Sequence, residues 1–455
     1  MPRWTAYLQA HRQRFLEELV SFLRIPSISG EAAHQADLAQ AARWVARRLQ
    51  QAGVPRVEML RAGESPVVFG EYGGEPGRPT VLIYGHFDVE PVGDLTDWVH
   101  PPFAPVVTGG CMYARGASDD KGNMLIPILA AEALLQCAGR LPVNLKFLFE
   151  GQEEVGSPDL PAFIAAQRNR LKCDVVLSAD GGQYGADLPA LIMSSRGYCA
   201  LQIDVTGPAT DLHSGVFGGT VQNPIHALVR LLDSMRRPDG AVAVAGFYDD
   251  VAELTALERQ RIAAVPFSAA AYEEQVGAGT VFGEPGYSTL ERCWARPSLE
   301  VNGIWGGSTG EGVQAIVPRT AHAKLTCRLV SGQTPDRVLD LLEQHVALHT
   351  PSHVQAKLRR LGGACRPYRM DDKHPANQRA HEVLAEVYGC DPVYVGTGAS
   401  VPVYTMFQDL LGVDTVTFGF GCDDENIHAP NEFLRLKNWD RGQMAYCRLI
   451  EELGR

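Results

Sequence analysis

Five short segments of the chain carry histidines and carboxylates of a kind that could bind metal ions. They are Gly85–Asp88, Arg115–Gly122, Glu150–Gly156, Ser178–Gly182 and Gly421–His428, and together they contain two histidines and several Asp and Glu residues. Imidazole and carboxylate donors without sulfur suit Zn²⁺, Mn²⁺ or Co²⁺. Two histidines and several acids are enough for two ions about 3.5–4 Å apart, bridged by a carboxylate and activating a water. One such acid alone would be a helix cap or a solvated loop residue, but five such segments favour a hydrolytic two-metal site.

The elements expected to position these residues are four short strands and a helix. Apolar runs bounded by turn residues predict strands at 80–84, 143–149, 173–177 and 415–418, and each of them leads into one of the segments. The fifth segment begins a helix predicted over 121–137, and further helices are predicted over 7–23, 158–171 and 375–388. Ligands of open α/β sheets lie beyond the carboxyl ends of the strands. We therefore expect an α/β domain with a mixed, largely parallel sheet and the site at that edge.

The middle of the chain has a different pattern. Strands that alternate polar and apolar residues are predicted over 197–206, 321–330 and 353–361, with helices over 223–235 and 335–349. Residues 237–297 are less regular. This predicts a smaller α+β domain at 196–365, inserted into an α/β domain formed by 1–195 and 366–455.

Composition excludes several classes of function. The 455 residues include 41 Lys+Arg and 53 Asp+Glu, for a net charge of −12, and 45% are hydrophobic. An acidic globular chain of this kind is a poor ligand for nucleic acid or anionic lipid. No apolar run reaches the length of a membrane span. No secretory signal pattern is visible, and the ten cysteines include no C-x-x-C pair. We expect reduced thiols and a cytoplasmic protein without nucleic-acid or membrane partners.

Several sequence blocks resemble the M20 family of metallopeptidases. They are GHFDVEP (85–91), RGASDDKG (115–122), EGQEEVGS (150–157), SADGG (178–182) and IHAPNE (427–432). The block DLHSGVFGG (211–219) is most similar to the dipeptidase and carnosinase branch. The resemblance implies a di-metal catalytic domain interrupted by an inserted ferredoxin-like lid and dimerisation domain. It also implies two divalent ions per subunit, with Zn²⁺ favoured over Mn²⁺ and Co²⁺.

The resemblance assigns a role to each residue of the site. It implies that His86 and Asp180 hold one ion, that Glu154 and His428 hold the other, and that Asp119 bridges them. Glu153 would be the general base that takes a proton from the attacking water, and Asp88 would orient the His86 ring.

Four residues outside the metal set are implied to contact substrate. By resemblance, His213 reaches the active site of the neighbouring subunit in a homodimer and stabilises the developing oxyanion. Arg328 would clamp the substrate α-carboxylate, with Ser400 and Asn302 also reaching the substrate. Carnosinase-like dipeptidases have a hydroxyl residue where this chain has Ala315. The side-chain preference for substrate is therefore open.

A serine hydrolase is the main alternative from a different class. Residues 306–310 (GGSTG) fit G-x-S-x-G, but a nucleophile elbow needs a following helix, and Gly310, Gly312 and Pro318 oppose one. The H-E-x-x-H zinc motif and the dinucleotide fingerprint are absent. A loop is the better interpretation of 306–310.

The expected activity is hydrolysis of an amide bond beside a free α-carboxylate, with dipeptides as the leading substrates. An N-acyl-amino-acid deacylase or a small carboxypeptidase of the same family is the alternative. A non-catalytic binding protein with this fold is a remote one, because the base Glu153 and all five ligands are present.

Overall fold

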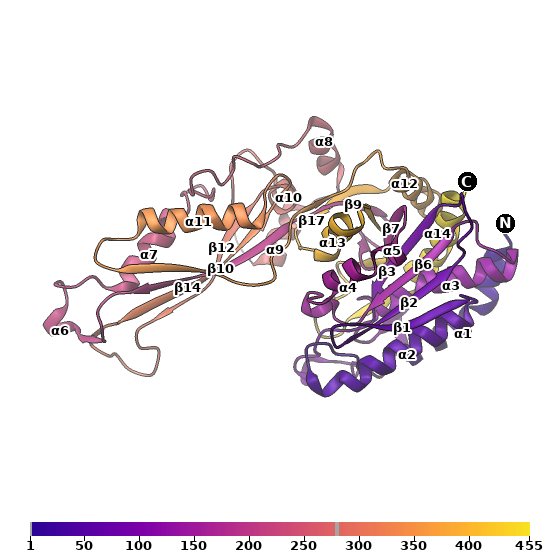
Figure 1. Ribbon diagram of the computed structural model, residues 1–455, viewed down its shortest axis with the longest axis horizontal. Coiled ribbons are helices and arrows are strands. Elements are labelled where there is room, and N and C mark those ends of the chain that lie inside the picture. Colours follow the sequence, from indigo (N-terminus) through magenta and orange to yellow (C-terminus); the bar gives the residue numbers. More distant parts are fainter. Residues whose placement is uncertain (1, 278–281) are drawn as a thin grey trace. The chain divides into compact units, whose positions relative to one another are not determined.

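The structure, a computed structural model, describes residues 2–277 and 282–455 (Figure 1). The chain folds into two compact units. The first comprises Met1–Met193, Met370–Val395 and Met406–Arg455, and the second comprises Ser194–Arg369 and Gly396–Thr405. Residues 396–405, which the sequence suggested for the catalytic domain, group with the second unit.

The first unit is built on a six-stranded mixed sheet of order β1-β2-β6-β3-β7-β18. These strands are β1 (Arg56–Ala62), β2 (Ser65–Tyr72), β6 (Asn144–Glu150), β3 (Thr80–His86), β7 (Val175–Ser178) and β18 (Thr415–Thr417). The pairs β6–β3, β3–β7 and β7–β18 are parallel, and β1–β2 and β2–β6 are antiparallel. Every residue of β6 is buried, as expected of a strand covered on both faces.

Helices pack against this sheet and against one another. Helix α2 contacts β1 and β2, α3 contacts β3, α12 contacts β18, and α14 packs on α3 and α12. The helices of this unit are α1 (Arg3–Leu23), α2 (Gln35–Gln51), α3 (Lys121–Ala138), α4 (Leu160–Ala166), α5 (Arg168–Leu171), α12 (Pro375–Tyr388) and α14 (Leu436–Leu453). Helix α3 is apolar and almost wholly buried, and it ends at Gly139, whose φ of 72° is the left-handed conformation that glycine adopts most easily.

Other short strands form small sheets of two or three strands. The parallel pair is β8 (Gly182–Gln183) with β19 (Gly421–Cys422), and a three-stranded sheet contains β4 (Val106–Thr108), β5 (Cys111–Tyr113) and β20 (Phe433–Arg435). A third small sheet contains β9 (Ala190–Ser195), β16 (Tyr368–Arg369) and β17 (Val393–Thr397), and α13 (Pro402–Leu411) follows β17 in the chain.

The second unit is a two-layer α+β domain. Its antiparallel sheet has the order β12-β14-β10-β15, from β10 (Gly197–Thr206), β12 (Ser298–Gly306), β14 (Thr320–Leu329) and β15 (Gln355–Arg360). Helices α7 (Pro224–Ser234) and α11 (Pro335–His349) share one hydrophobic core with the sheet. The chain order β10-α7-β12-β14-α11-β15 with this strand order is the ferredoxin-like topology, so the prediction for this domain's fold is confirmed.

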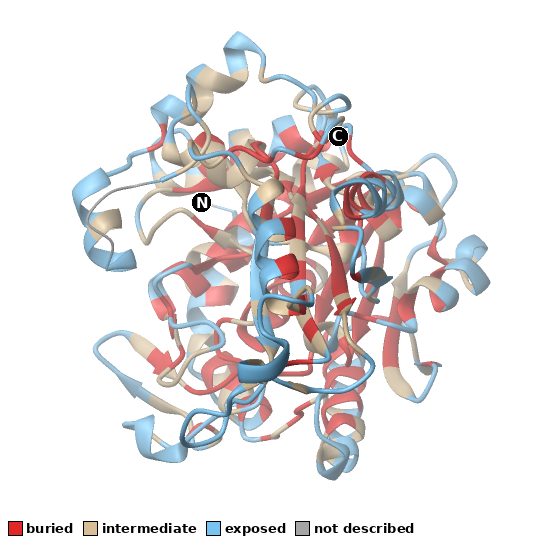
Figure 2. Cartoon of the chain, turned by 90° about the vertical axis from the view of Figure 1, so that its left-hand side faces the viewer, coloured by how far each residue is buried: buried red, intermediate tan, exposed pale blue. Residues whose placement is uncertain are grey.

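Local sequence signals explain the helices of the second unit. Asn223 caps α7 and Thr334 caps α11 with side-chain hydrogen bonds, and each helix has proline in its first turn. The irregular region contains α8 (Ala256–Ala264), α9 (Ala269–Val276) and α10 (Thr289–Ala295). Figure 2 shows buried residues, in red, on many of the strands, and exposed residues, in pale blue, on many of the outer helices and loops.

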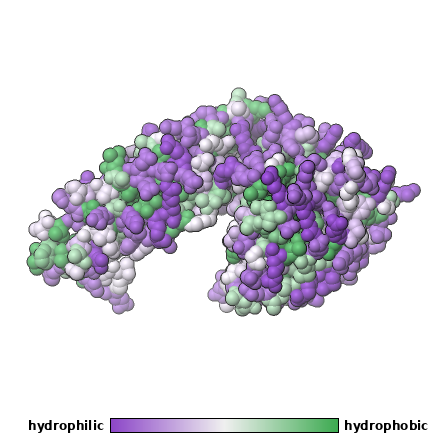
Figure 3. Space-filling view, viewed as in Figure 1, coloured by the Kyte–Doolittle hydropathy of each residue, from purple (hydrophilic) through white to green (hydrophobic). Residues whose placement is uncertain are grey.

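One end of the second unit carries exposed apolar residues. It contains β11 (Leu212–His213), α6 (Ser214–Phe217) and β13 (Ile316–Val317). Val216 and Phe217 of α6 are 66% and 42% exposed. Figure 3 shows the hydrophobic cluster at the end where α6 lies.

The sequence did not predict every element. Strands β1, β2 and β12 were not foreseen, and the helix predicted over 158–171 is two helices separated at Gln167. None of the helices in the described part of the chain has both the length and the hydropathy needed to cross a bilayer. The ten cysteines are free thiols.

Candidate metal centre

The parallel strands of the first unit deliver the candidate ligands to one edge of the sheet. His86 is the last residue of β3, and Asp180 comes two residues after β7, the parallel neighbour of β3. On the other side of β3, strand β6 leads into a short 3₁₀ helix, Glu153–Val155, which holds Glu153 and Glu154. Asp119 lies just before α3. Because β6, β3 and β7 are parallel, their carboxyl ends meet at the same edge.

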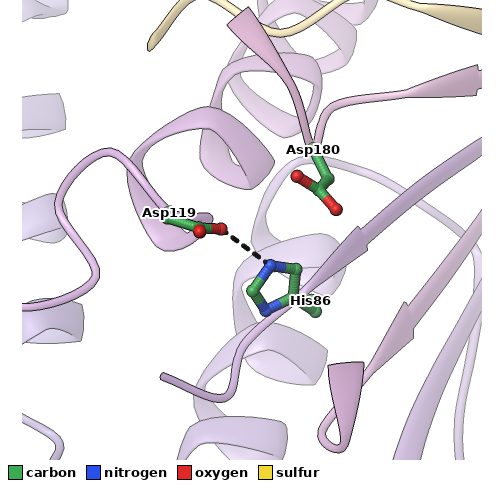
Figure 4. A group of neighbouring side chains, drawn as sticks. All are labelled: His86, Asp119 and Asp180. Atoms are coloured by element: carbon green, nitrogen blue, oxygen red, sulfur yellow. Dashed lines mark hydrogen bonds and ion pairs between the residues drawn. The ribbon is translucent and has the colours of Figure 1, made fainter. Parts of the chain in front are cut away.

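One group of three candidate ligands consists of His86 and two carboxylates that lie close to it (Figure 4). Each of His86, Asp119 and Asp180 offers an atom, and these atoms all lie within 4.8 Å of one another. His86 Nε2 lies 3.0 Å from Asp119 Oδ1, and the His86 side chain is fully buried. A nitrogen and two carboxylates that converge in this way fit a divalent cation of the zinc type.

A second group surrounds His428. Glu90, Glu154 and His428 offer ligand atoms that also lie within 4.8 Å of one another. His428 Nε2 lies 3.0 Å from Glu154 Oε2 and 3.0 Å from Asp119 Oδ2. One oxygen of Asp119 therefore faces His86 and the other faces His428. This is the arrangement required of a carboxylate that bridges two ions.

Mutual contacts among these groups govern their proton affinity. Hydrogen bonds to Asp119 and Glu154 raise the pKa of His428 to about 11. Burial alone would lower the pKa of His86, but hydrogen bonds to Asp119 and Asp88 outweigh it and the pKa rises. Burial raises the pKa of Glu154 to about 7 and that of Asp180 to about 6. A proton and a divalent cation therefore compete for the same side-chain atoms at this centre.

Asp88 links the His86 strand to the turn that carries the two glutamates. Its carboxylate is fully buried, lies 3.4 Å from His86 Nδ1, and accepts hydrogen bonds from the amides of Glu153 and Glu154 at 3.2 and 3.1 Å. Burial raises the pKa of the Glu153 carboxyl well above its ordinary value, and nearby carboxylates raise it further. A carboxyl with a raised pKa can both accept and return a proton, as general acid–base work requires.

A buried glutamate supports the loop that presents Asp119. Glu432 accepts hydrogen bonds from the amides of Gly116, Ser118 and Asp119 at 2.9, 3.0 and 3.1 Å, and it pairs with Arg115 Nη1 at 2.9 Å. Both side chains of this ion pair are almost completely buried. The residue that precedes β20 is thereby tied to the loop that precedes α3.

Two of the predicted substrate residues meet in the second unit. Arg328, on β14, donates from Nη1 to Ser400 Oγ at 2.7 Å, and its guanidinium lies 5.1 Å from the centre of the Tyr198 ring. These two residues are separated by 72 positions in sequence. A guanidinium beside a hydroxyl can receive a carboxylate.

The other two predicted substrate residues lie apart on the second unit's surface. His213 is exposed, and its Nδ1 accepts the Gly215 amide at 3.0 Å. Asn302 is exposed in β12, where the pairing register with β14 shifts between Val301 and Gly303. The structure describes no contact that joins either residue to Arg328.

The serine-hydrolase interpretation fails on local structure. Ser308 follows β12, but the next regular element of the chain is the two-residue strand β13. A nucleophile elbow places its serine between a strand and a helix. Residues 307–310 form a loop after β12, and the sequence had indicated a loop here.

Two acids of the centre were not predicted. The signal for Glu90 is its spacing, since residues 86, 88 and 90 alternate as in an extended segment and all three face the centre. Glu432 is part of the block IHAPNE, and no local pattern indicates that it supports the Asp119 loop.

Comparison with known proteins agrees with this architecture. Residues 82–452 match the model of peptidase family M20/M25/M40. The Cys-Gly metallodipeptidase of Schizosaccharomyces pombe is 32% identical over 97% of this chain and 96% of its own length. The human Beta-Ala-His dipeptidase is 28% identical over 98% of this chain and 91% of its own. The solved M20 metallo-carboxypeptidase Sso-CP2 of Sulfolobus solfataricus superposes with a TM-score of 0.84 at 29% identity, covering 97% and 99% of the two chains.

The family match spans most of the chain, and the ligand groups fall inside the matched region. The fold agrees as well, because the mixed sheet and the ferredoxin-like unit occur in a chain that superposes over nearly its whole length on a metallopeptidase of this family. The chain belongs to peptidase family M20/M25/M40 and is a hydrolase of the metallopeptidase type.

Proposed function

We propose that this protein is a metal-dependent dipeptidase whose centre binds two divalent ions. The observation that carries the proposal is the placement of Asp119, whose two oxygens each lie 3.0 Å from a different histidine, His86 and His428. His86, Asp119 and Asp180 form one ligand set, and Asp119, Glu154 and His428 form the other. Zn²⁺ is the favoured ion, and Mn²⁺ and Co²⁺ accept the same donors.

The residues of the centre divide the work of amide hydrolysis. When bound, the ions acidify a water and polarise the amide carbonyl. Glu153 takes the proton from the attacking water and returns it to the leaving amine. The Asp88 carboxylate accepts a hydrogen bond from the backbone amide of Glu153, which holds Glu153 in place. The same carboxylate orients the His86 ring.

The substrate class follows from Arg328 and Ser400. Their 2.7 Å hydrogen bond places a guanidinium beside a hydroxyl, a pair that suits a terminal carboxylate, so substrates with a free α-carboxyl group are expected. The names of two relatives, a Cys-Gly metallodipeptidase and a Beta-Ala-His dipeptidase, support dipeptides as substrates. The likeness to a metallo-carboxypeptidase keeps a small carboxypeptidase as the second candidate, and an N-acyl-amino-acid deacylase would use the same carboxylate site.

A substrate panel separates these activities. The metal-free protein is reconstituted with Zn²⁺, Mn²⁺ or Co²⁺ and assayed for amine release from dipeptides, tripeptides and N-acetyl amino acids. Cleavage of dipeptides at least tenfold more efficiently than of the other two classes supports the proposal. Preference for N-acetyl amino acids or for longer peptides would overturn it in favour of the corresponding alternative.

We further propose that His213 acts in the neighbouring subunit of a homodimer. The Gly215 amide donates to His213 Nδ1, so the ring carries its proton on Nε2 as a donor. A neutral donor of this kind can stabilise an oxyanion. Self-association is supported by Val216 and Phe217 beside His213 and by the edge strand β12, where Ile304 and Trp305 are 50% and 41% exposed.

Complementation between two inactive variants tests the action in trans. Glu153→Gln lacks the base and His213→Ala lacks the donor, so each homodimer is expected to be inactive. A mixture allowed to exchange subunits regains activity in one of the two sites of each heterodimer, because that site has its own Glu153 and receives His213 from the other chain. An active monomer, or no recovery in verified heterodimers, would exclude action in trans.

On this proposal, the first unit is the catalytic domain and the second is the lid and dimerisation domain. The ten free cysteines suit a reducing compartment such as the cytoplasm. Ala315, which lacks the hydroxyl found at this position in carnosinase-like dipeptidases, lies close to His213. Its backbone carbonyl accepts a hydrogen bond from the Ser214 amide at 2.8 Å. Substrate preference is therefore expected to differ from that of carnosinases at this point.

A further inference from the structure

A second arginine, Arg196, lies beside Arg328 in the second unit. Both side chains are partly buried. Among the residues of this unit that the structure describes, neither guanidinium forms an ion pair with a carboxylate. Burial lowers the pKa of the Arg196 guanidinium, and the adjacent charge of Arg328 lowers it further. Two neighbouring cations without a counter-ion are costly unless an anion joins them.

Arg196 also holds the segment that carries Ser400. Its backbone amide donates to the Ala399 carbonyl at 3.1 Å, and its Nε donates to the Gly398 carbonyl at 3.0 Å. An added Cβ at Gly398 would lie only 3.2 Å from Arg196 Nη2, so the guanidinium packs closely against this backbone. Ser400, two residues on, accepts the hydrogen bond from Arg328.

From these contacts we infer that Arg196 is a positioning residue and the second cation of the substrate-carboxylate site. It fixes the Gly398–Ser400 backbone so that Ser400 meets Arg328, and its charge adds to the attraction for the terminal carboxylate. Both effects depend on the carboxylate and are independent of the proton transfers at the amide. This inference rests on the proposed dipeptidase function.

Loss of Arg196 is expected to weaken substrate binding selectively. A hydrogen bond to a charged group contributes about 1.5–3 kcal/mol, which corresponds to a factor of roughly 10–100 in affinity. In the metal-loaded enzyme, Arg196→Gln should raise KM for Ala-Gly by about that factor and leave kcat within about threefold. Arg196→Lys keeps the charge but cannot keep the planar fork, so its KM should lie between those of wild type and Arg196→Gln.

The C-terminal amide of the same dipeptide isolates the carboxylate. Ala-glycinamide cannot use the site, so its kcat/KM should be the same for wild type and Arg196→Gln. Arg337→Gln is the matched control, because Arg337 is an exposed arginine of α11 whose nearest carboxylate partner, Asp250, lies 3.9 Å away. Removal of the Arg337 charge should leave kcat/KM unchanged for both Ala-Gly and Ala-glycinamide.

Equilibrium binding provides a readout that does not depend on turnover. Affinities of a reduced-amide analogue of Ala-Gly and of its carboxamide are measured by calorimetry with each metal-loaded variant. Wild type should prefer the carboxylate analogue, and Arg196→Gln should lose most of that preference. Equal losses for both analogues, an unchanged KM, or a fall in kcat alone would overturn the role of Arg196. Failure of wild type to cleave any dipeptide would instead overturn the proposed function, and the binding comparison would still test Arg196.

Discussion

The carboxylate of Glu432 accepts a hydrogen bond from the backbone amide of Asp119 at 3.1 Å, although 313 positions separate these residues in sequence. The same carboxylate receives the amides of Gly116 and Ser118 and the guanidinium of Arg115. The residue proposed to bridge two ions is thus held by its main chain, which leaves both side-chain oxygens directed at the histidines. Supports of this kind around metal ligands commonly change metal affinity 10–100-fold.

Replacement of Glu432 should loosen the metal centre without removing a ligand. Glu432→Gln keeps the shape but loses the charge opposite Arg115 and presents an NH₂ group to backbone donors. We expect metal affinity to fall about 10–100-fold and the protein to lose about 3–5 kcal/mol of stability, as when one partner of a buried ion pair is removed. Competition with a chromophoric chelator and urea unfolding measure the two effects. Unchanged metal affinity would show that Asp119 does not depend on Glu432.

Replacement of Glu153 by glutamine should separate catalysis from metal binding. The change removes the proposed base but none of the proposed ligands, so both ions should remain while kcat falls by about 10²–10⁴-fold. Metal content by mass spectrometry and initial rates provide the measurement. The adjacent Glu154→Gln is the control, because it should lose affinity for the ion near His428. Near-normal turnover in Glu153→Gln would exclude Glu153 as the base.

Metal removal should abolish activity, whereas serine-directed reagents should not. A strong chelator is expected to inactivate the enzyme fully, and Zn²⁺, Mn²⁺ or Co²⁺ should restore it. Serine-directed reagents should have no effect because Ser308 lies in a loop. Metal binding should also release protons, since protons between His428 and its carboxylate partners must leave first. Calorimetry in buffers of different ionisation enthalpy counts them, and activity that survives full metal depletion would refute the two-metal proposal.

The stability of the second unit should fall at mildly acidic pH through His345. This histidine is buried in α11, its Nε2 lies 2.9 Å from Ser234 Oγ, and its ring stacks on His349 with ring centres 3.9 Å apart. Burial, with the neighbouring His349, lowers the pKa of His345 to about 4, against about 6.5 in an unfolded chain. Between about pH 4 and about pH 6.5, the His345 ring is therefore protonated in the unfolded state but not in the folded state. The stability contribution is complete above about pH 6.5 and falls by about 1.4 kcal/mol per pH unit toward pH 4.

Urea unfolding at pH 7.5 and pH 5 tests this linkage. His345→Asn cannot titrate, so the loss of stability between the two pH values should be smaller in the variant than in wild type. The exposed-ring control is His353→Asn, which should retain the wild-type pH dependence. Equal losses in wild type and His345→Asn would exclude His345 as the source.

The sequence was sufficient for those features that local patterns encode. The helices over 335–349 and 375–388 and the strand over 197–206 have the boundaries that periodicity predicts, because capping residues, prolines and alternation act within a few residues. The strands that end at His86 and before Asp180 were equally readable, since their β-branched and apolar runs are short and bounded by turns. Strands β1 and β12 were missed because buried and exposed residues mix in them without a clear period. Strand β2 was missed although residues 67–70 at its centre are buried.

What the sequence by itself determined is the type of chemistry, since only certain donors suit divalent cations and those donors recur at strand ends. The tertiary structure decided which donors meet: it directed the two oxygens of Asp119 at His86 and His428, placed Glu90 with the second group, and set Glu432 beneath the Asp119 loop. It also paired Arg328 with Ser400 and placed Arg196 behind them. These relationships depend on distances between residues hundreds of positions apart. Packing of parallel strands and helices sets those distances, and no local pattern in the chain records them.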